Sequence, residues 1–179
     1  MTEVAPPAIA TLSDVQLALD GDEMAFARLV SAHHAEMARV AYAISGDTHV
    51  AEDAVQAAWA SAWRKLASVR DSERIRPWLI AIAVNETRQV LRHQRRTPVA
   101  EIDLNQRAPE GADPAIGITR LDLRRALARL DPDDRALLAL RYVAGFDAAE
   151  IGAMTGRSAS GTRARLSRLT ARMREDLGR

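Results

Sequence analysis

The stretch Asp147–Arg174, DAAEIGAMTGRSASGTRARLSRLTARMR, holds the strongest local pattern of the chain. Asp147 followed by Glu150 three residues later has the form of a capping box, which begins a short helix, and Thr155-Gly156 ends that helix. Ser158 then begins a longer helix. Two helices joined by a tight, glycine-containing turn are typical of a helix-turn-helix, whose second helix enters the major groove of DNA.

The second helix of this stretch separates packing residues from basic ones. At about 100° per residue, one face carries Thr162, Leu166, Leu169, Met173 and Leu177. The opposite face carries Ser160, Gly161, Ala164 and Arg168, with Arg163, Arg165, Arg172 and Arg174 on its flanks. Small residues allow close approach to base edges, and guanidinium groups reach phosphates or guanine. The alternative is a surface helix with solvated arginines.

A second basic helix is predicted at Trp78–Arg96, WLIAIAVNETRQVLRHQRR. Its interior face is formed by Leu79, Ile82, Ala83 and Val90, and its polar edge by Asn85, Arg88, Gln89, Arg92 and His93. An asparagine or glutamine can hydrogen-bond an unpaired base, and arginines bind phosphates. Two basic helices therefore indicate a protein that contacts one nucleic acid at two places.

The charges of the 179-residue chain are segregated, although its net charge is only +1. Residues 1–60 carry nine acidic and two basic side chains, and residues 158–179 carry six arginines and two acids. This asymmetry predicts a nucleic-acid surface at one end and a repelling or protein-binding surface at the other. Clustered but solvated helix faces are the alternative interpretation.

Helical periodicity runs through almost the whole sequence, so we predict an all-α fold of two small helical domains joined by a flexible linker. Asp22, Asp47 or Thr48, Pro77 and Asp131-Pro132 are the predicted starts of further helices. The predicted segments are a disordered tail at residues 1–12, a first domain at 13–96, an acidic linker at 97–120 and a second domain at 121–179. The linker prediction rests on scattered prolines and glycines and on four acids against one arginine in residues 97–118.

The sequence excludes several chemistries. The chain has no cysteine, so it has no disulfide or zinc-thiolate site. No apolar run approaches the about 20 residues of a membrane span, which predicts a cytoplasmic protein. His33-His34 is a poor metal pair because adjacent residues point to different helix faces, and His49 with Glu52 and Asp53 is better read as a charged first helical turn. We expect no cofactor, no metal and no catalytic residue, and therefore no enzyme.

Four segments, in this order, resemble the extracytoplasmic-function sigma factors of bacterial RNA polymerase. They are AEDAVQAAWASAWRKL, RPWLIAIAVNETRQVLRHQRR, LDPDDRALLALRYVAGFDAAEIGAMTGRS and RARLSRL. The resemblance extends from about Leu17 to Leu177. It implies a sigma domain 2 helical bundle, a sigma domain 4 helix-turn-helix, and a subunit that recognises promoters and promotes DNA melting, in response to stress or an envelope signal.

The resemblance also implies three sets of site residues. Contacts to the β′ clamp helices of core polymerase would come from Asp53, Gln56, Trp59, Trp63, Arg64 and Lys65. Contacts to the minus-10 element would come from Asn85, Arg88, Gln89, Arg92, His93, Arg95 and Arg96. Contacts to the minus-35 element would come from Ser158, Ser160, Gly161, Arg163, Arg165 and Arg168. The polymerase β flap and an anti-sigma factor are the other implied partners.

Some of these positions keep an alternative. Trp59 and Trp63 lie four residues apart and can instead pack inside the bundle. Trp78 is a possible stacking wedge, but its apolar neighbours favour a core position. Gly161 and Thr162 differ from what relatives carry, so sequence preference is not transferable. A stand-alone helix-turn-helix regulator is the competing function, although it leaves the basic helix Trp78–Arg96 unexplained.

Overall fold

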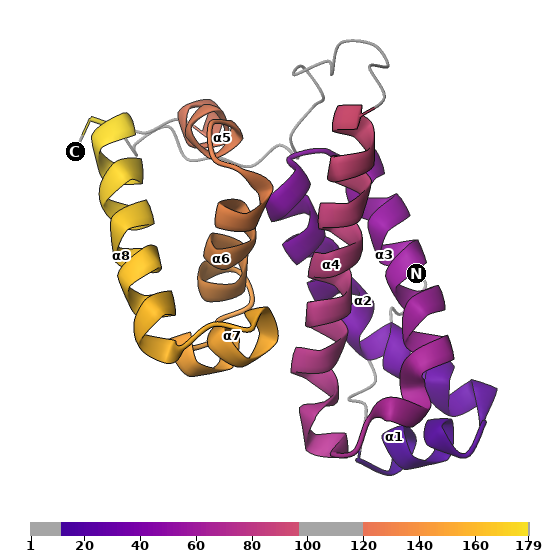
Figure 1. The fold of residues 1–179 in the computed structure, drawn as a ribbon. Helices are drawn as coiled ribbons and strands as arrows, with labels where there is room; N and C mark the ends of the chain where they lie inside the picture. Colours follow the sequence, from indigo (N-terminus) through magenta and orange to yellow (C-terminus); the bar gives the residue numbers. More distant parts are fainter. Residues whose placement is uncertain (1–11, 97–119, 179) are drawn as a thin grey trace, which may run out of the picture.

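The computed structural model describes residues 12–96 and 120–178, and these two ranges contain helices and no β-strand (Figure 1). The first range holds α1 (Leu12–Leu19), α2 (Glu23–Ser45), α3 (Thr48–Lys65), two 3-10 turns (Leu66–Ser68 and Ser72–Arg74) and α4 (Ile75–Arg96). The second holds α5 (Arg120–Ala128), α6 (Pro132–Tyr142), α7 (Ala148–Thr155) and α8 (Ala159–Asp176). The all-α prediction is confirmed. The predicted tail and linker lie, except for Leu12 and Arg120, outside the described residues.

Short acidic side chains set most of the helix starts. The Asp22 carboxylate accepts hydrogen bonds from the backbone N–H groups of Met24 and Ala25, at 2.8 and 3.0 Å. Asp47 caps α3 and Asp131 caps α6 in the same way. Each carboxylate satisfies N–H groups that have no partner within the helix and places a negative charge at its positive end. These starts were predicted from the sequence and are confirmed.

The start of α4 was predicted near Pro77, and the helix begins two residues earlier, at Ile75. The side chain of Asp71 accepts from the Glu73 N–H at 3.0 Å and caps a 3-10 turn, and this turn runs directly into α4 at Ile75. Pro77 therefore lies inside the first turn of the helix. Proline is tolerated there because the N–H that it lacks would have no helical acceptor.

The first four helices form one bundle, in which α2, α3 and α4 contact each other along their lengths and α1 packs on α2. Fully buried side chains of α2, among them Leu29, Met37 and Ile44, pack between the helices. Buried alanines are frequent on α3 and allow the helix backbones to approach closely. On α4 the buried face consists of Leu79, Ile80, Ala83 and Val84, while Ile82 is only partly buried.

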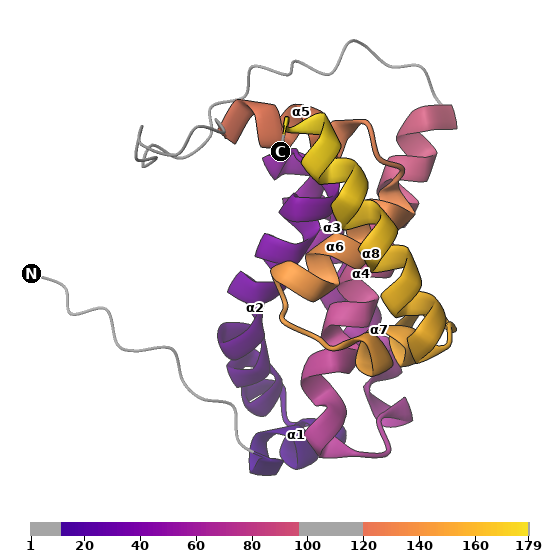
Figure 2. The ribbon, with the colours of Figure 1, turned by 90° about the vertical axis from the view of Figure 1, so that its left-hand side faces the viewer.

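The last four helices pack against this bundle. Helix α6 contacts α2 and α4, α7 contacts α4, and α8 lies on the other side of α6 and α7 (Figures 1 and 2). The buried residues of both groups form one continuous hydrophobic cluster, in which Phe146, Leu130, Leu140 and Ile151 are the largest fully buried side chains of the C-terminal range. We refer to α1–α4 as the N-terminal bundle and to α5–α8 as the C-terminal bundle. The sequence had left the relative arrangement of the two bundles open.

Helices α7 and α8 are joined by a very tight turn. Gly156 ends α7 in the left-handed conformation, with φ of 69°, and only Arg157 and Ser158 follow before α8 begins. Gly152 makes this turn possible, because a Cβ atom on it would stand 2.6 Å from the carbonyl oxygen of Arg157. The sequence pattern did not single out Gly152.

We therefore predict that Gly152→Ala destabilises the protein by about 1 to 3 kcal/mol, the usual cost of an overpacked site with a backbone clash. Ala153→Ser is the matched control, because Ala153 is exposed on the same helix and surface changes usually stay within about 0.5 kcal/mol. Urea unfolding followed by circular dichroism measures both. Equal stability of the two variants would contradict the close approach of this turn.

Candidate nucleic-acid and polymerase interfaces

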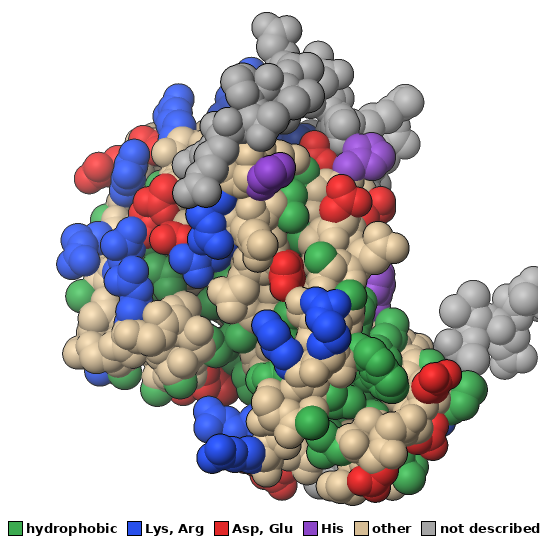
Figure 3. Space-filling view, turned by 45° about the vertical axis from the view of Figure 1, so that its right-hand side comes forward, with side chains coloured by type: hydrophobic (Ala, Val, Ile, Leu, Met, Phe, Trp, Pro, Cys, Tyr) green, Lys and Arg blue, Asp and Glu red, His purple; other side chains and the backbone are tan. Residues whose placement is uncertain are grey.

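Helix α8 presents a basic face to solvent. The Ser158 hydroxyl caps it by accepting from the Gly161 N–H at 3.1 Å. Thr162, Leu166, Leu169 and Met173 are buried, as the sequence predicted. The opposite face is exposed and carries Ser160, Gly161, Arg163, Ala164, Arg168, Arg172 and Arg174. Figure 3 shows basic side chains gathered over the C-terminal bundle, on the left of that view.

Thr162 stands at a packing position and is completely buried. Its hydroxyl donates to the Ser158 carbonyl oxygen at 3.0 Å, so the buried polar atom has a partner inside its own helix. The methyl group of the threonine remains available for packing. This departure from an apolar residue therefore leaves the attachment of α8 intact.

Arg165 differs from the other predicted minus-35 residues. Its Nε–H donates to Asp134 on α6 at 2.6 Å, and its Nη2 lies 3.9 Å from an oxygen of Asp131. The hydrogen bond with Asp134 raises the pKa of Arg165 above its ordinary value. Asp134 is buried, so this pair connects α8 to α6. Ser160, Arg163 and Arg168 share the exposed face, whereas Arg165 is turned toward α6.

The predicted minus-10 residues lie along α4. Asn85, Gln89, Arg92 and His93 are exposed, which leaves their polar groups free to meet a ligand. Arg88 is only 25% exposed in its side chain, because its guanidinium forms an ion pair with Asp133 of α6. The side chains of Arg95 and Arg96 lie outside what the structure describes. Arg88 of this minus-10 set therefore lies against α6 of the C-terminal bundle.

The predicted polymerase-contacting residues lie on α3, and the two tryptophans among them differ. Trp59 is partly buried; its Nε1–H donates to His34 Nδ1 at 3.2 Å, and its ring meets the edge of Phe26. Trp63 is 42% exposed, although it also touches Phe26. Trp59 thus belongs mainly to the bundle and Trp63 mainly to the surface. Asp53, Gln56, Arg64 and Lys65 are exposed around them.

Two further features surround this stripe. Ser61 donates to Glu86 of α4 at 2.7 Å and accepts from Arg64 at 3.2 Å, so a polar chain connects α3 with α4. Leu17 and Met24 are large exposed hydrophobic residues of the same bundle, and Figure 3 shows hydrophobic side chains gathered over its lower right part. The sequence reasoning missed Ser61 and Glu86, whose spacing carries no signal. Trp78 packs partly buried against the core, as favoured from its neighbours.

Within residues 12–96 and 120–178, no group of three histidine or acidic side chains is arranged to hold a metal ion. His34 accepts the indole hydrogen bond of Trp59, and His33 lies half-buried beside Glu36 and Arg76. None of the helices in these ranges is long and apolar enough to cross a membrane.

Comparison with known families and proteins assigns both bundles. Residues 29–97 match sigma-70 region 2, and residues 120–173 match sigma-70 region 4. CarQ, an RNA polymerase sigma factor of Myxococcus xanthus, is 33% identical over 170 residues, which are 89% of this chain and 92% of CarQ. SigM, an ECF RNA polymerase sigma factor of Mycobacterium tuberculosis, is 31% identical over 88% of this chain and 80% of SigM. RfaY, a probable sigma factor of Xanthomonas campestris, is 30% identical, but the matched region is only 41% of RfaY.

Solved structures share the fold. CnrH in complex with the cytosolic domain of CnrY superposes with a TM-score of 0.67 at 24% identity, covering 92% of this chain and 94% of CnrH. RpoE from Bartonella quintana, solved with the anti-sigma factor NepR, gives 0.64 at 23% identity and covers 93% of this chain. With these matches and the helix-turn-helix, the chain belongs to the extracytoplasmic-function sigma factors, the promoter-recognising subunits of bacterial RNA polymerase.

Arg165 and Arg168 are expected to behave differently on substitution. Arg165→Ala leaves the buried Asp134 carboxylate without its partner, which costs about 1 to 3 kcal/mol of folding stability. Arg168→Ala removes an exposed group, so its stability stays near that of the wild type while promoter binding weakens by about 1 to 3 kcal/mol if it reads a base. Thermal unfolding and electrophoretic mobility shift assays on both variants separate the two roles. Equal thermal stability would show that the Asp134 pair contributes nothing.

His33 is expected to make stability depend on pH. Burial lowers the pKa of His33; Glu36 opposes this effect and Arg76 adds to it. The unfolded chain then binds more protons than the folded one as the pH falls below about 6.5, so stability that is present above that pH is lost progressively below it. Urea unfolding between pH 5 and 8 tests this, with His33→Gln as the variant that should flatten the dependence. A slope that persists in His33→Gln would assign it to other groups.

Proposed function

We propose that this sigma factor binds core polymerase through α3, engages the opened minus-10 strand through α4 and reads the minus-35 duplex through α8. The observation that carries the proposal is the basic exposed face of α8, held behind a capped two-helix turn whose inward face is buried. The exposed polar edge of α4 supports a second contact with the same DNA. Polymerase and promoter meet in the cytoplasm, so the protein acts there.

The polymerase contact is assigned to the stripe around Trp63. Trp63 is an exposed indole next in sequence to Arg64 and Lys65, and Asp53 is exposed nearer the start of the same helix, so α3 offers a large apolar contact together with charges of both signs, as protein–protein hot spots do. Trp59 supports this surface from below through His34 and Phe26. The β′ clamp helices are the proposed partner for this stripe and the β flap the proposed partner for the C-terminal bundle.

The minus-10 contact uses side chains that suit single-stranded DNA. Asn85 and Gln89 lie one helical turn apart on α4 and are exposed, so their amides can hydrogen-bond the edges of unpaired bases. Arg92 and His93 continue the exposed edge toward the end of the helix. The positive charge of Arg92 attracts the phosphate backbone there. Separating base pairs costs a few kcal/mol, which the capture of an extruded base offsets.

An anti-sigma factor is the proposed regulatory partner, acting in response to stress or an envelope signal. Support comes from the solved relative RpoE, which was crystallised with the anti-sigma factor NepR, and from the exposed hydrophobic residues Leu17, Met24 and Trp63. Exposed hydrophobic residues of this kind are typical of a site where a partner protein binds, which supports an anti-sigma partner.

In-vitro transcription with purified core polymerase tests the proposal, using genomic fragments as templates. We expect specific transcripts, footprints at both promoter elements and permanganate-reactive thymines near minus-10. The double variant Asn85→Ala/Gln89→Ala is expected to keep the minus-35 footprint and lose most of the permanganate reactivity. Glu175→Ala, an exposed change on α8, is the control that keeps both. A duplex footprint without any polymerase-dependent transcript would instead identify a stand-alone regulator.

A further inference from the structure

Three aromatic side chains of α2 and α3 form a continuous chain that ends at the surface. The ring of Phe26 meets that of Trp59 edge-on, with 5.7 Å between the ring centroids and 90° between the ring planes. The centroid of the same ring lies 4.7 Å from that of Trp63, at 66°. Trp63 is 42% exposed, whereas Phe26 and Trp59 are partly buried. The two tryptophans therefore share one packing partner, and a displacement of Trp59 changes the ring against which Trp63 packs.

His34 fixes the other end of this chain. Its Nδ1 atom accepts a hydrogen bond from the Trp59 Nε1–H at 3.2 Å. An indole has one donor and no acceptor, so a single hydrogen bond sets the direction of its ring. An imidazole nitrogen accepts only when it carries no proton. The form of His34 that holds Trp59 is therefore the neutral one, with its hydrogen on Nε2.

His34 does not belong to the buried face of its own helix. Its side chain is exposed, and its neighbour His33 lies half-buried beside Glu36 and Arg76 instead. The buried face of α2 consists of Ala25, Leu29, Met37, Val40, Ala41 and Ile44. The described contact of His34 is thus made to the aromatic chain and not to the apolar residues of the bundle interior.

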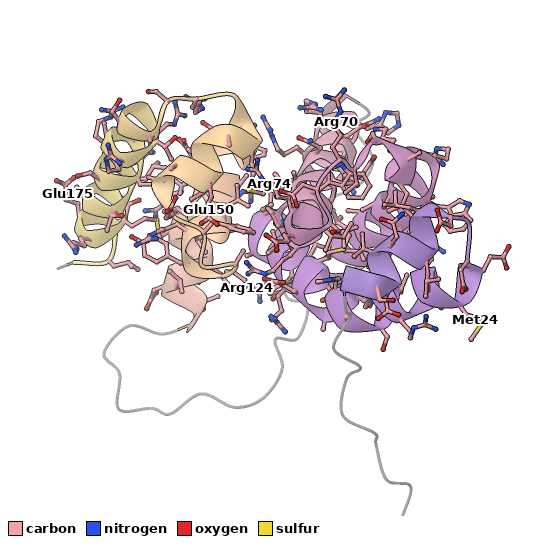
Figure 4. The ribbon with its side chains drawn as sticks, turned by 90° about the horizontal axis from the view of Figure 1, so that it is seen from below. Met24, Arg70, Arg74, Arg124, Glu150 and Glu175 are labelled. Atoms are coloured by element: carbon pink, nitrogen blue, oxygen red, sulfur yellow. The ribbon has the colours of Figure 1, made fainter. Side chains whose placement is uncertain are left out.

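The aromatic chain lies on helices that are open to a partner. Helix α3 packs on α2 and α4, and Figure 1 shows it on the side of the N-terminal bundle away from α5–α8. Figure 4 shows Met24, two residues before Phe26, at the edge of the N-terminal bundle opposite the C-terminal bundle. Met24 is 69% exposed. A partner can therefore reach this side of the molecule while the two bundles are packed together.

We propose that His34 is a positioning residue for polymerase binding, which sets the presentation of Trp63 through Trp59 and Phe26. The inference rests on the proposed contact of α3 with core polymerase. While His34 accepts from Trp59, the three rings keep one arrangement, and Trp63 meets its partner already ordered. A side chain that is ordered only on binding lowers the affinity, so the hydrogen bond favours the complex. Protonation of His34 replaces the acceptor by a donor and releases Trp59.

Charged side chains of both helices flank the pair of His34 and Trp59. On α3, Asp53 stands six residues before Trp59 and Arg64 five residues after it. On α2, Glu36 and Arg39 follow His34 most closely, and Glu36 is paired with Arg76 of α4. All of these groups are unchanged in the variants that test the proposal. A comparison between such variants therefore reports on the acceptor at position 34.

The first test measures binding of the full chain to immobilised core polymerase. His34→Leu keeps the bulk of the side chain but removes the acceptor, and we expect several-fold weaker binding. His34→Asn places an amide oxygen about where Nδ1 stands, so it is expected to restore most of the affinity. His49→Leu makes the same substitution at another exposed histidine, ten residues before Trp59, and is expected to bind as the wild type does. Circular dichroism at the assay temperature confirms that each variant is folded. Equal weakening by His49→Leu, or no recovery in folded His34→Asn, would overturn the proposal.

Two further measurements separate positioning from a general effect on stability. The indole N–H resonance of Trp59, assigned with Trp59→Phe, reports the hydrogen bond directly, and we expect it to shift in His34→Leu but to stay near its wild-type place in His34→Asn. The second measurement is the ratio of the wild-type affinity to that of His34→Asn at each pH, in which the contributions of polymerase and of His33 cancel. This ratio is expected to fall several-fold as the pH is lowered from about 8 to 5, the range in which histidines change charge, because asparagine keeps its acceptor. A constant ratio, or an unshifted resonance in His34→Leu, would contradict the positioning role.

Trp63→Ala distinguishes a failure of this inference from a failure of the proposed function. If Trp63→Ala weakens polymerase binding while His34→Leu binds as the wild type does, the positioning role fails and the assignment of α3 stands. If Trp63→Ala itself binds core polymerase as tightly as the wild type, the polymerase contact assigned to α3 is wrong, and the role of His34 falls with it.

Discussion

The arrangement of the molecule depends on the acidic first turn of α6. A helix N-terminus favours negative charge, so three aspartates are stable there, and each has a different task. Asp131 caps the helix, Asp134 attaches α8 through Arg165, and Asp133 reaches Arg88 on α4. One turn therefore sets the position of the recognition helix within its own bundle and helps to set the position of that bundle on the other. The same carboxylates decide which arginines remain available to DNA.

Apolar packing and charge play different parts in this fold. Alanine-rich faces bring α2, α3 and α4 close together, and the continuous buried cluster extends into α6 and α7. Such packing specifies which faces meet but is tolerant of small shifts. The guanidinium groups of Arg76, Arg88 and Arg165 add directional contacts with fixed acceptors. Exposed arginines such as Arg163 and Arg168 have no such partner among the interactions of the described residues and remain free for a ligand.

Local signals in the sequence predicted the helices well, because a cap acts on atoms two or three residues away. Asp22, Asp47, Asp131, Asp147 and Ser158 were found in this way, and the inward face of α8 followed from its period. The partners of Arg88 and Arg165 lie 45 and 31 positions along the chain, and no local pattern reports such distances. The different environments of Trp59 and Trp63 were also hidden, because their spacing places them on one face and both contact Phe26; the hydrogen bond from Trp59 to His34 and the greater exposure of Trp63 distinguish them. The helix-turn-helix was therefore predictable, whereas the accessibility of individual contact residues was not.

Lysine occurs once in this chain, at Lys65, where α3 ends among exposed residues beside Trp63. Apart from the four histidines, all other basic side chains are guanidinium groups, which do not react with amine-directed reagents under mild conditions. A mild acylating reagent thus modifies only one side chain, on the surface assigned to polymerase, and leaves both arginine-lined DNA surfaces chemically unaltered. The uneven use of the two basic amino acids gives the protein a built-in handle by which one of its interfaces can be addressed separately from the others.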